Sequence, residues 1–282
     1  MYVAVHSWSF RDRFKQDKSF DIFQAMDMAQ EMGFKGMEIM TGKANVPPED
    51  IGTDTVQGLR KVLRYAQDKG LNIYSYATYN DFSYVKDEAW RLANIEYIKK
   101  WLRLAGETGV PNIRMLTGYL VAGEDPQRLA DLVLKGIAEC IPVAEEAGVN
   151  MAIENHNSIF MKGEEIVGLI RRFGSKRLTA CPDPSNACSK FFDPACSPAD
   201  RDAVYKNLEV MAPYATASHL KVRGLNPDGS LLGWDMKRLL AIYRKAGYDG
   251  VIAFESVVDG DLLAPLAKAR EAVEKAIARA NR

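Results

Sequence analysis

One stretch of apolar residues runs directly into side chains that could do chemistry. The sequence VNMAIENHN, residues 149–157, is mainly apolar up to Ile153 and then presents Glu154 and His156. Because side chains alternate along a strand with a period of two, Glu154 and His156 point to the same side if the strand continues that far. A carboxylate and an imidazole on one side of a strand are suited to proton transfer or to holding a metal ion.

Three later stretches of the same kind also contain acidic or imidazole side chains. LTACPD ends in Asp183, ATASHLKV contains His219, and VIAFES contains Glu255. Taken singly, each acid could be a cap or a surface charge. Carboxylates that lie close together repel one another unless protons or a cation compensate. Together with Glu154 these residues therefore predict a site for one divalent metal ion, with Mn²⁺ favoured and Mg²⁺, Co²⁺, Fe²⁺ or Zn²⁺ as alternatives.

These stretches belong to an alternation of strands and helices along the whole chain. The predicted strands are YVAVHS, GMEIM, NIYSYAT, NIRMLTG, NMAIEN, LTACPD, ATASHLKV and VIAFES. They recur every 30 to 40 residues or so, which is about the length of one strand–helix unit. Eight such units predict a single (β/α)8 TIM barrel over residues 1–282, with its chemistry at the C-terminal ends of the strands. A doubly wound open sheet is the alternative, but no G-x-G-x-x-G turn follows the first strand.

Helices and one long loop complete the expected architecture. Helices are predicted within 21–34, 128–148 and 235–250, and they end near Gly33, Gly148 and Gly247. The segment 188–201 is predicted to be the longest irregular loop after a strand. We expect it to lie over the barrel mouth as a lid or as a dimer contact.

The composition is that of an ordinary globular protein and argues against several classes of protein. The chain is 47% hydrophobic and 26% charged, and its 37 basic and 37 acidic residues give zero formal net charge. A zero balance argues against nucleic acid and anionic membrane surfaces as partners. No apolar run approaches the roughly 18 residues of a membrane span. The N-terminus lacks signal-peptide features, and the four cysteines lack C-x-x-C spacing, which predicts reduced thiols in the cytoplasm.

Several motifs together resemble the xylose isomerase-like TIM-barrel superfamily of sugar isomerases, epimerases and some dehydratases. They are GFKGMEI, PNIRMLTG, AIENHN, ACPDPSN, SHLKVRG and AGYDGVIAFES, which cover nearly the whole chain. The resemblance implies that Glu154, Asp183, His219 and Glu255 hold one divalent metal ion. It also implies that Glu154 and Glu255 move protons, as the metal-bound glutamates of ketose epimerases do. Asn186 departs from the histidine that those epimerases carry at this position.

Eight further residues are predicted to contact the substrate. They are His6, Trp8, Glu38, Arg114, His156, Asn186, Lys221 and Arg223. Simpler interpretations stand beside this one, because His6 could be a core histidine and Trp8 could pack. Glu38 could pair with a basic residue, and a buried Arg114 needs a carboxylate or an anionic ligand.

The resemblance predicts a sugar isomerase or epimerase that abstracts a proton α to a carbonyl through a metal-stabilised enediolate. The alternative is a lyase using the same enediolate, either a dehydratase of keto-inositols or keto-acids or an eliminase of 3-keto-glycosides. A second alternative is a non-catalytic metal-binding or sugar-binding barrel. The loop SVVDGD, residues 256–261, is acidic and favours a non-phosphorylated substrate. Three histidines and zero net charge argue against the DNA-repair endonuclease branch. A homo-oligomer is possible.

Overall fold

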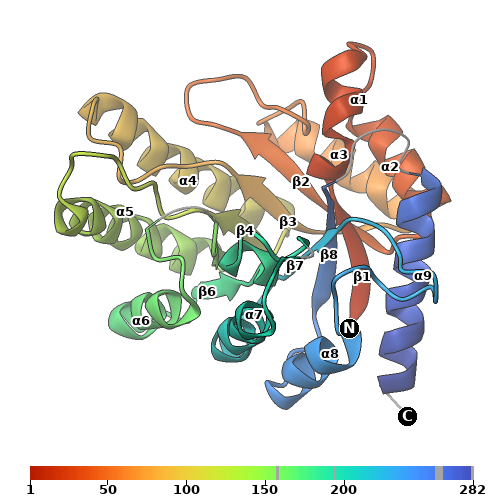
Figure 1. Cartoon of the computed structure of the whole chain (residues 1–282). Helices are drawn as coiled ribbons and strands as arrows, with labels where there is room; N and C mark the ends of the chain where they lie inside the picture. Colours follow the sequence, from red (N-terminus) through yellow and green to blue (C-terminus); the bar gives the residue numbers. More distant parts are fainter. Residues whose placement is uncertain (157–158, 194, 258–262, 281–282) are drawn as a thin grey trace.

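The parallel strands form the centre of the molecule and the helices surround them (Figure 1). The structure is a computed structural model that describes residues 1–156, 159–193, 195–257 and 263–280. The strands are β1 (Tyr2–His6), β2 (Gly36–Gly42), β3 (Asn72–Thr78), β4 (Asn112–Met115), β5 (Asn150–Glu154), β6 (Leu178–Cys181), β7 (His219–Val222) and β8 (Val251–Ser256). The α-helices are α1 (Arg11–Gln16), α2 (Ile22–Glu31), α3 (Val56–Asp68), α4 (Glu88–Thr108), α5 (Pro126–Ala147), α6 (Gly163–Phe173), α7 (Pro198–Met211), α8 (Met236–Lys245) and α9 (Leu263–Ala280). The described residues also form the short 3-10 helices η1 (Ser7–Phe10), η2 (Pro184–Ala187) and η3 (Ala212–Tyr214).

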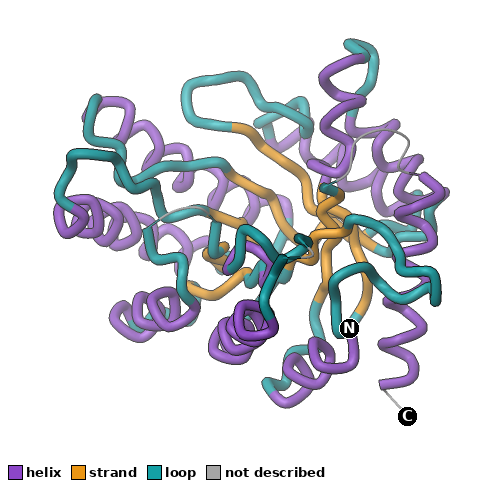
Figure 2. Tube along the Cα trace, in the orientation of Figure 1, coloured by secondary structure: helices purple, strands orange, loops and turns teal. Residues whose placement is uncertain are grey.

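The sheet curls into a barrel whose seam lies between β6 and β7. The strand order is β6-β5-β4-β3-β2-β1-β8-β7, and every ladder is parallel. At the seam, the Thr216 amide donates to the Ala180 carbonyl at 3.1 Å and the His219 amide donates to the Pro182 carbonyl at 2.9 Å. The predicted single (β/α)8 fold is therefore confirmed. Figure 2 shows the strands at the centre with the helices outside them.

Local sequence signals explain how the helices begin and end around this barrel. The Asp125 side chain accepts the Gln127 amide hydrogen at 3.0 Å, and Pro126 starts α5. The same helix ends at Gly148, whose φ of 69° is the left-handed conformation that glycine adopts without steric cost. The helix predicted to end at Gly148 therefore ends there. The expected helices within 21–34 and 235–250 form α2 and α8.

The prediction for the segment 188–201 is partly wrong. Residues 198–201 form the first turn of α7, because the Ser197 hydroxyl accepts the Asp200 amide hydrogen at 3.1 Å and Pro198 occupies the first turn. The rest of the segment, residues 188–197, is shorter than the loops 43–55 and 223–235 that follow β2 and β7. Strand β7 also begins later than the stretch ATASHLKV suggested.

None of the helices in the described residues combines the length and the apolar composition that a membrane span requires.

The barrel interior is a separate, small-residue core. The main hydrophobic core includes the helix-facing sides of the strands, whereas a second cluster contains Ala4, Tyr74, Ala152, Cys181, Ala217, Val251 and Ala253. Most members of this second cluster are small. They form a floor that leaves room for larger side chains one layer higher in the barrel.

Candidate functional site

A polar layer lies directly above the small-residue floor. Ala4, Ala152, Cys181, Ala217 and Ala253 belong to the floor, and two residues after each of them come His6, Glu154, Asp183, His219 and Glu255. His6, Glu154 and Glu255 lie in the same strands as their floor residues, so the period of two turns these three side chains to the same interior side. All five polar residues are buried. The sequence thus repeats one pattern, a small residue followed two positions later by a polar one, around the barrel.

His219 is oriented by Glu38 from the opposite end of the sequence. The His219 Nε2 atom lies 2.5 Å from Glu38 Oε2, and both side chains are fully buried. Burial alone would raise the pKa of Glu38, but the adjacent His219, His6 and Arg114 lower it to about 2. An ionised carboxylate at Nε2 requires a proton on that nitrogen. The hydrogen bond from Nε2 to Glu38 fixes the imidazole ring so that its Nδ1 atom faces the centre of the site.

Two glutamates converge on the Nδ1 atom of His219. Glu255 Oε1 lies 3.2 Å and Glu154 Oε1 lies 3.6 Å from it. Two groups of side chains bring possible ligand atoms within 4.8 Å of one another, namely His6, His219 and Glu255, and Glu154, Asp183 and His219. The structure therefore brings together the four residues to which the sequence assigns a metal.

Arg114 and His6 complete the side of the site near β1 and β4. The Arg114 Nε atom lies 3.2 Å from Glu154 Oε2, and its Nη1 donates to the Thr78 carbonyl at 2.8 Å. Burial alone would raise the pKa of Glu154, but the Arg114 charge and the His219 contact hold that pKa well below its usual value. Burial lowers the pKa of His6 to about 4, so its imidazole is neutral near pH 7.

Lys221 lies on the opposite side of the site. Its ammonium contacts the Asp183 carboxylate, donates to Asn186 Oδ1 at 2.7 Å and lies 3.5 Å from Glu255 Oε2. Asn186 in turn donates to Glu154 Oε1 at 3.1 Å. Lys221 and Asn186 therefore connect Glu154, Asp183 and Glu255 in one network.

Asn155 is a site residue that the sequence reasoning missed. Asp183 lies beyond the end of β6, and the Asn155 side chain holds its backbone from both sides. The Asp183 amide donates to Asn155 Oδ1 at 2.8 Å, and Asn155 Nδ2 donates to the Asp183 carbonyl at 2.9 Å. The signal was present in the sequence, since Asn155 is a polar residue between Glu154 and His156 at the end of an apolar strand.

Three of the residues predicted to contact substrate pack against aromatic rings or basic side chains outside the buried polar layer. The His156 ring packs edge-on against Tyr79, with centroids 6.1 Å apart. Trp8 is 38% exposed, and the Arg11 and Lys15 side chains lie over its ring. The Arg223 guanidinium lies over Phe192 at 5.2 Å from the ring centroid.

The charge and hydrogen bonding of the central layer suit a divalent cation. Four buried carboxylates (Glu38, Glu154, Asp183 and Glu255) face two side-chain cations (Arg114 and Lys221), so the layer carries a net negative charge whether His219 is neutral or protonated. In the described part of the chain, the buried atoms Glu38 Oε1 and His219 Nδ1 have no hydrogen-bond partner. Unsatisfied buried polar atoms are rare and require an explanation. A bound cation would compensate the charge and would take His219 Nδ1 as a ligand.

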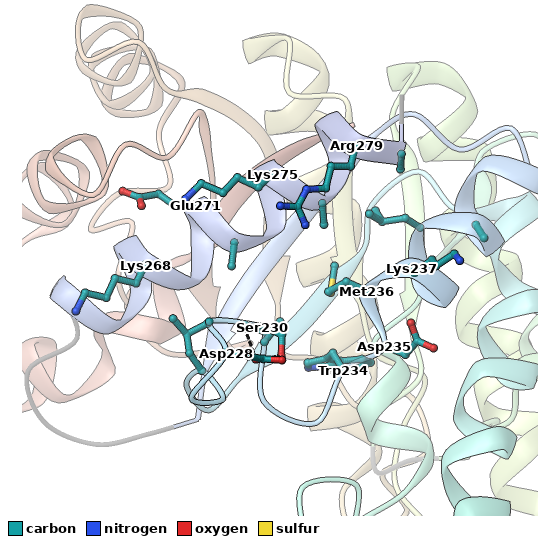
Figure 3. A pocket seen from close by; sticks show the side chains of 18 of the residues that line it. Asp228, Ser230, Trp234, Asp235, Met236, Lys237, Lys268, Glu271, Lys275 and Arg279 are labelled. Atoms are coloured by element: carbon teal, nitrogen blue, oxygen red, sulfur yellow. Dashed lines mark hydrogen bonds between the residues drawn. The ribbon is translucent and has the colours of Figure 1, made fainter. Parts of the chain in front are cut away.

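A cavity lies away from this layer. A groove of about 1110 Å³ runs between α8, α9 and the loop 225–231, and Figure 3 shows Trp234, Lys268 and Arg279 among its lining residues. None of the residues of the buried polar layer lines it. This groove is therefore separate from the candidate site.

Eight parallel strands with intervening helices define a (β/α)8 protein, and the candidate site is the polar layer within its barrel. The family model for the xylose isomerase-like TIM barrel matches residues 26–279, and the chain belongs to this family. None of the curated proteins matches the sequence.

Solved structures share the fold at low sequence identity. The 3-keto-D-glucoside 4-epimerase of E. coli is 15% identical with a TM-score of 0.70, and the match covers 99% of each chain. An L-ribulose 3-epimerase is 18% identical with a TM-score of 0.70, and the match covers 99% of this chain and 97% of that one. A xylose isomerase-like TIM barrel protein from Mycobacterium smegmatis, solved in complex with magnesium, is 19% identical with a TM-score of 0.70 over 100% and 98% of the two chains.

Proposed function

We propose that this protein is a divalent-metal-dependent sugar isomerase or epimerase. The observation that carries the proposal is the convergence of Glu154 and Glu255 on His219 Nδ1 within a buried layer in which four carboxylates face two side-chain cations. The names of the structural neighbours, which include several sugar epimerases, support the same reaction class.

In this proposal Glu154, Asp183, His219 and Glu255 hold the metal ion, with Mn²⁺ favoured by the oxygen-rich donor set. When bound, the ion would act as a Lewis acid toward a carbonyl oxygen and its neighbouring hydroxyl. The carboxylates of Glu154 and Glu255 are the bases of the reaction, and both are ionised because nearby cations hold their pKa values below the usual range against the effect of burial.

The reaction requires two proton transfers at carbon. One glutamate removes the proton α to the substrate carbonyl, which gives an enediolate. Return of a proton by the other glutamate to the opposite face of the same carbon is epimerisation, and return to the neighbouring carbon is isomerisation. Arg114 holds Glu154 in place, whereas Lys221 and Asn186 place hydrogen-bond donors near Glu255 and Glu154.

Lyase chemistry is the second candidate, because an ammonium lies beside a proton-moving carboxylate. Lys221 Nζ is 3.5 Å from Glu255 Oε2, so it can assist the departure of a group β to the carbonyl.

We further propose a non-phosphorylated substrate and a cytoplasmic location. The proposal of a non-phosphorylated substrate rests on Asp259 and Asp261 of the loop 256–261, and both lie outside the described residues. All four cysteines are free thiols, which supports the cytoplasmic location.

The deciding experiment is a mass-spectrometric screen in D₂O with the Mn²⁺-loaded protein. Free ketoses, keto-inositols and 3-keto-glycosides are offered in parallel. Deuterium gained at carbon without a change of formula supports the isomerase or epimerase, whereas loss of water or of an aglycone supports the lyase. Glu154→Gln and Glu255→Gln should lower turnover by about 100-fold or more. Absence of any turnover by the wild type with all three classes would favour a binding protein.

A further inference from the structure

Lys221 stands between two of the carboxylates that the proposed function assigns to the metal. Its ammonium contacts Asp183 and lies 3.5 Å from Glu255 Oε2, while Asn186 Oδ1 accepts from it at 2.7 Å. The side chain is 18% exposed, whereas that of Asp183 is fully buried. A flexible cation therefore reaches into the acidic centre from the side of the barrel mouth.

Both carboxylate oxygens of Asp183 are already engaged. Oδ1 accepts from the Ser185 hydroxyl at 2.9 Å, and Oδ2 accepts from Lys221. A metal ion that takes Oδ2 as a ligand must share it with the ammonium or displace it. Lysine is suited to displacement, because its ammonium is a compact charge on a flexible stem and makes no fixed bidentate contact.

We propose that Lys221 is an internal counter-ion that competes with the divalent metal for Asp183. Without metal, the ammonium offsets the repulsion between Asp183 and Glu255 and keeps the two carboxylates in place. With metal, the same charge weakens binding, so Lys221 sets an upper limit on metal affinity. This inference rests on the metal site of the proposed function.

The first test measures Mn²⁺ affinity by calorimetry for the wild type, Lys221→Met and Lys206→Met. Lys206 is an α7 residue whose side chain is 71% exposed, and its only ion pair is with Asp202 among the described residues, so it controls for the loss of one positive charge. Removal of the Lys221 charge leaves the layer with one more negative charge, and Mn²⁺ should bind on the order of tenfold more tightly. Lys206→Met should bind as the wild type does. Unchanged or weaker binding by Lys221→Met would overturn the proposal.

The second test uses only the wild-type protein and does not depend on a variant that folds. Acetic anhydride acetylates free amines, and peptide mass spectrometry measures the rate at Lys221 and at Lys206. If the metal displaces the ammonium from Asp183, Mn²⁺ should raise the acetylation rate of Lys221 severalfold and leave that of Lys206 unchanged. An equal Lys221 rate with and without bound Mn²⁺ contradicts the competition.

The two proposals fail in different ways. If the wild type does not bind Mn²⁺ or another divalent ion, the metal site itself is wrong and both proposals fall. If the wild type binds Mn²⁺ but Lys221→Met gains no affinity and Lys221 reactivity does not change, only the counter-ion role is wrong.

Discussion

At the scale of single residues, the candidate site depends on pairs that fix one another's orientation. Glu38 accepts from His219 Nε2 at 2.5 Å and also lies 3.4 Å from His6 Nε2. One carboxylate thus faces two imidazoles and determines which nitrogen of His219 points toward Glu154 and Glu255. Replacing a residue that hydrogen-bonds to a metal ligand typically lowers metal affinity by about 10–100-fold.

Replacement of Glu38 by glutamine should weaken metal binding. The amide loses the charge that holds the proton on His219 Nε2, so we expect Mn²⁺ affinity to fall by about 10–100-fold. Calorimetric titration measures this. Glu96→Gln, at an exposed α4 residue that pairs with Lys99, is the matched control and should bind normally. Equal affinities for the two variants would show that Glu38 does not orient His219.

A second residue-scale feature is a carboxyl group at the rim, Asp50. The Ser7 hydroxyl donates to Asp50 Oδ2 at 2.5 Å, and burial raises the pKa of Asp50 to about 6. Because the folded protein holds this proton more tightly than the unfolded chain does, the folded state loses stability as the pH rises from about 4 to about 6.

The variant Asp50→Asn should remove that pH dependence. The free energy of unfolding of the variant, relative to the wild type, should increase by about 1–2 kcal/mol between pH 4 and pH 6.5. Urea unfolding at both pH values measures it. If the difference in free energy of unfolding between Asp50→Asn and the wild type stays constant or falls over this pH range, ionisation of Asp50 does not destabilise the folded protein.

At the scale of elements, helix α5 supports the strand ends that hold Arg114. Phe82 follows β3, is fully buried, and its amide donates to the Thr117 carbonyl at 3.2 Å. A Cβ atom at Gly136 of α5 would lie 2.7 Å from the Phe82 ring, so the absence of a side chain there permits the close approach. Contact between α5 and this loop thus fixes the rim next to β4.

The variant Gly136→Ala should therefore destabilise the protein although alanine favours helix formation. Overpacking against Phe82 should lower the free energy of unfolding by about 1–3 kcal/mol. Gly168→Ala in α6 is the control, because nothing lies within 4 Å of its added Cβ, and it should gain about 0.5–1 kcal/mol. Chemical denaturation compares the two. Stabilisation by both substitutions would mean that Phe82 moves away freely.

At the scale of the whole molecule, the site spans the seam of the barrel. Few backbone hydrogen bonds join β6 to β7, whereas Lys221 on β7 contacts Asp183 beyond β6. The proposed metal ligands come from β5, the end of β6, β7 and β8. A bound ion would therefore connect the two edge strands of the sheet.

We propose that residues 1–282 form a single domain that unfolds in one cooperative transition. Mn²⁺ at about 100 times its dissociation constant should add about 2.7 kcal/mol to the free energy of unfolding, because the ion binds the folded state alone. Differential scanning calorimetry with Mn²⁺ and with a chelator measures the midpoints. Two separate transitions would contradict the single domain, and an unchanged midpoint would contradict the metal site.

The sequence by itself determined the barrel and the acidic residues at its mouth. Both depend on local patterns, namely the recurrence of strand–helix units and the alternation of side chains along each strand. Glu154 and Glu255 could be placed this way because each ends a nearly continuous apolar stretch. Asp183 was identified as well, although it lies beyond its strand.

Only the tertiary structure decided how these residues are paired. Glu38 and His219 are 181 positions apart, and Arg114 could have met any of several carboxylates. Which partner each side chain contacts depends on the curvature and register of the closed sheet, because these bring distant strands to the same depth in the barrel. No local pattern encodes which of these side chains face one another, so the contacts of Glu38 with His219 and of Lys221 with Asp183 are visible only in the folded chain.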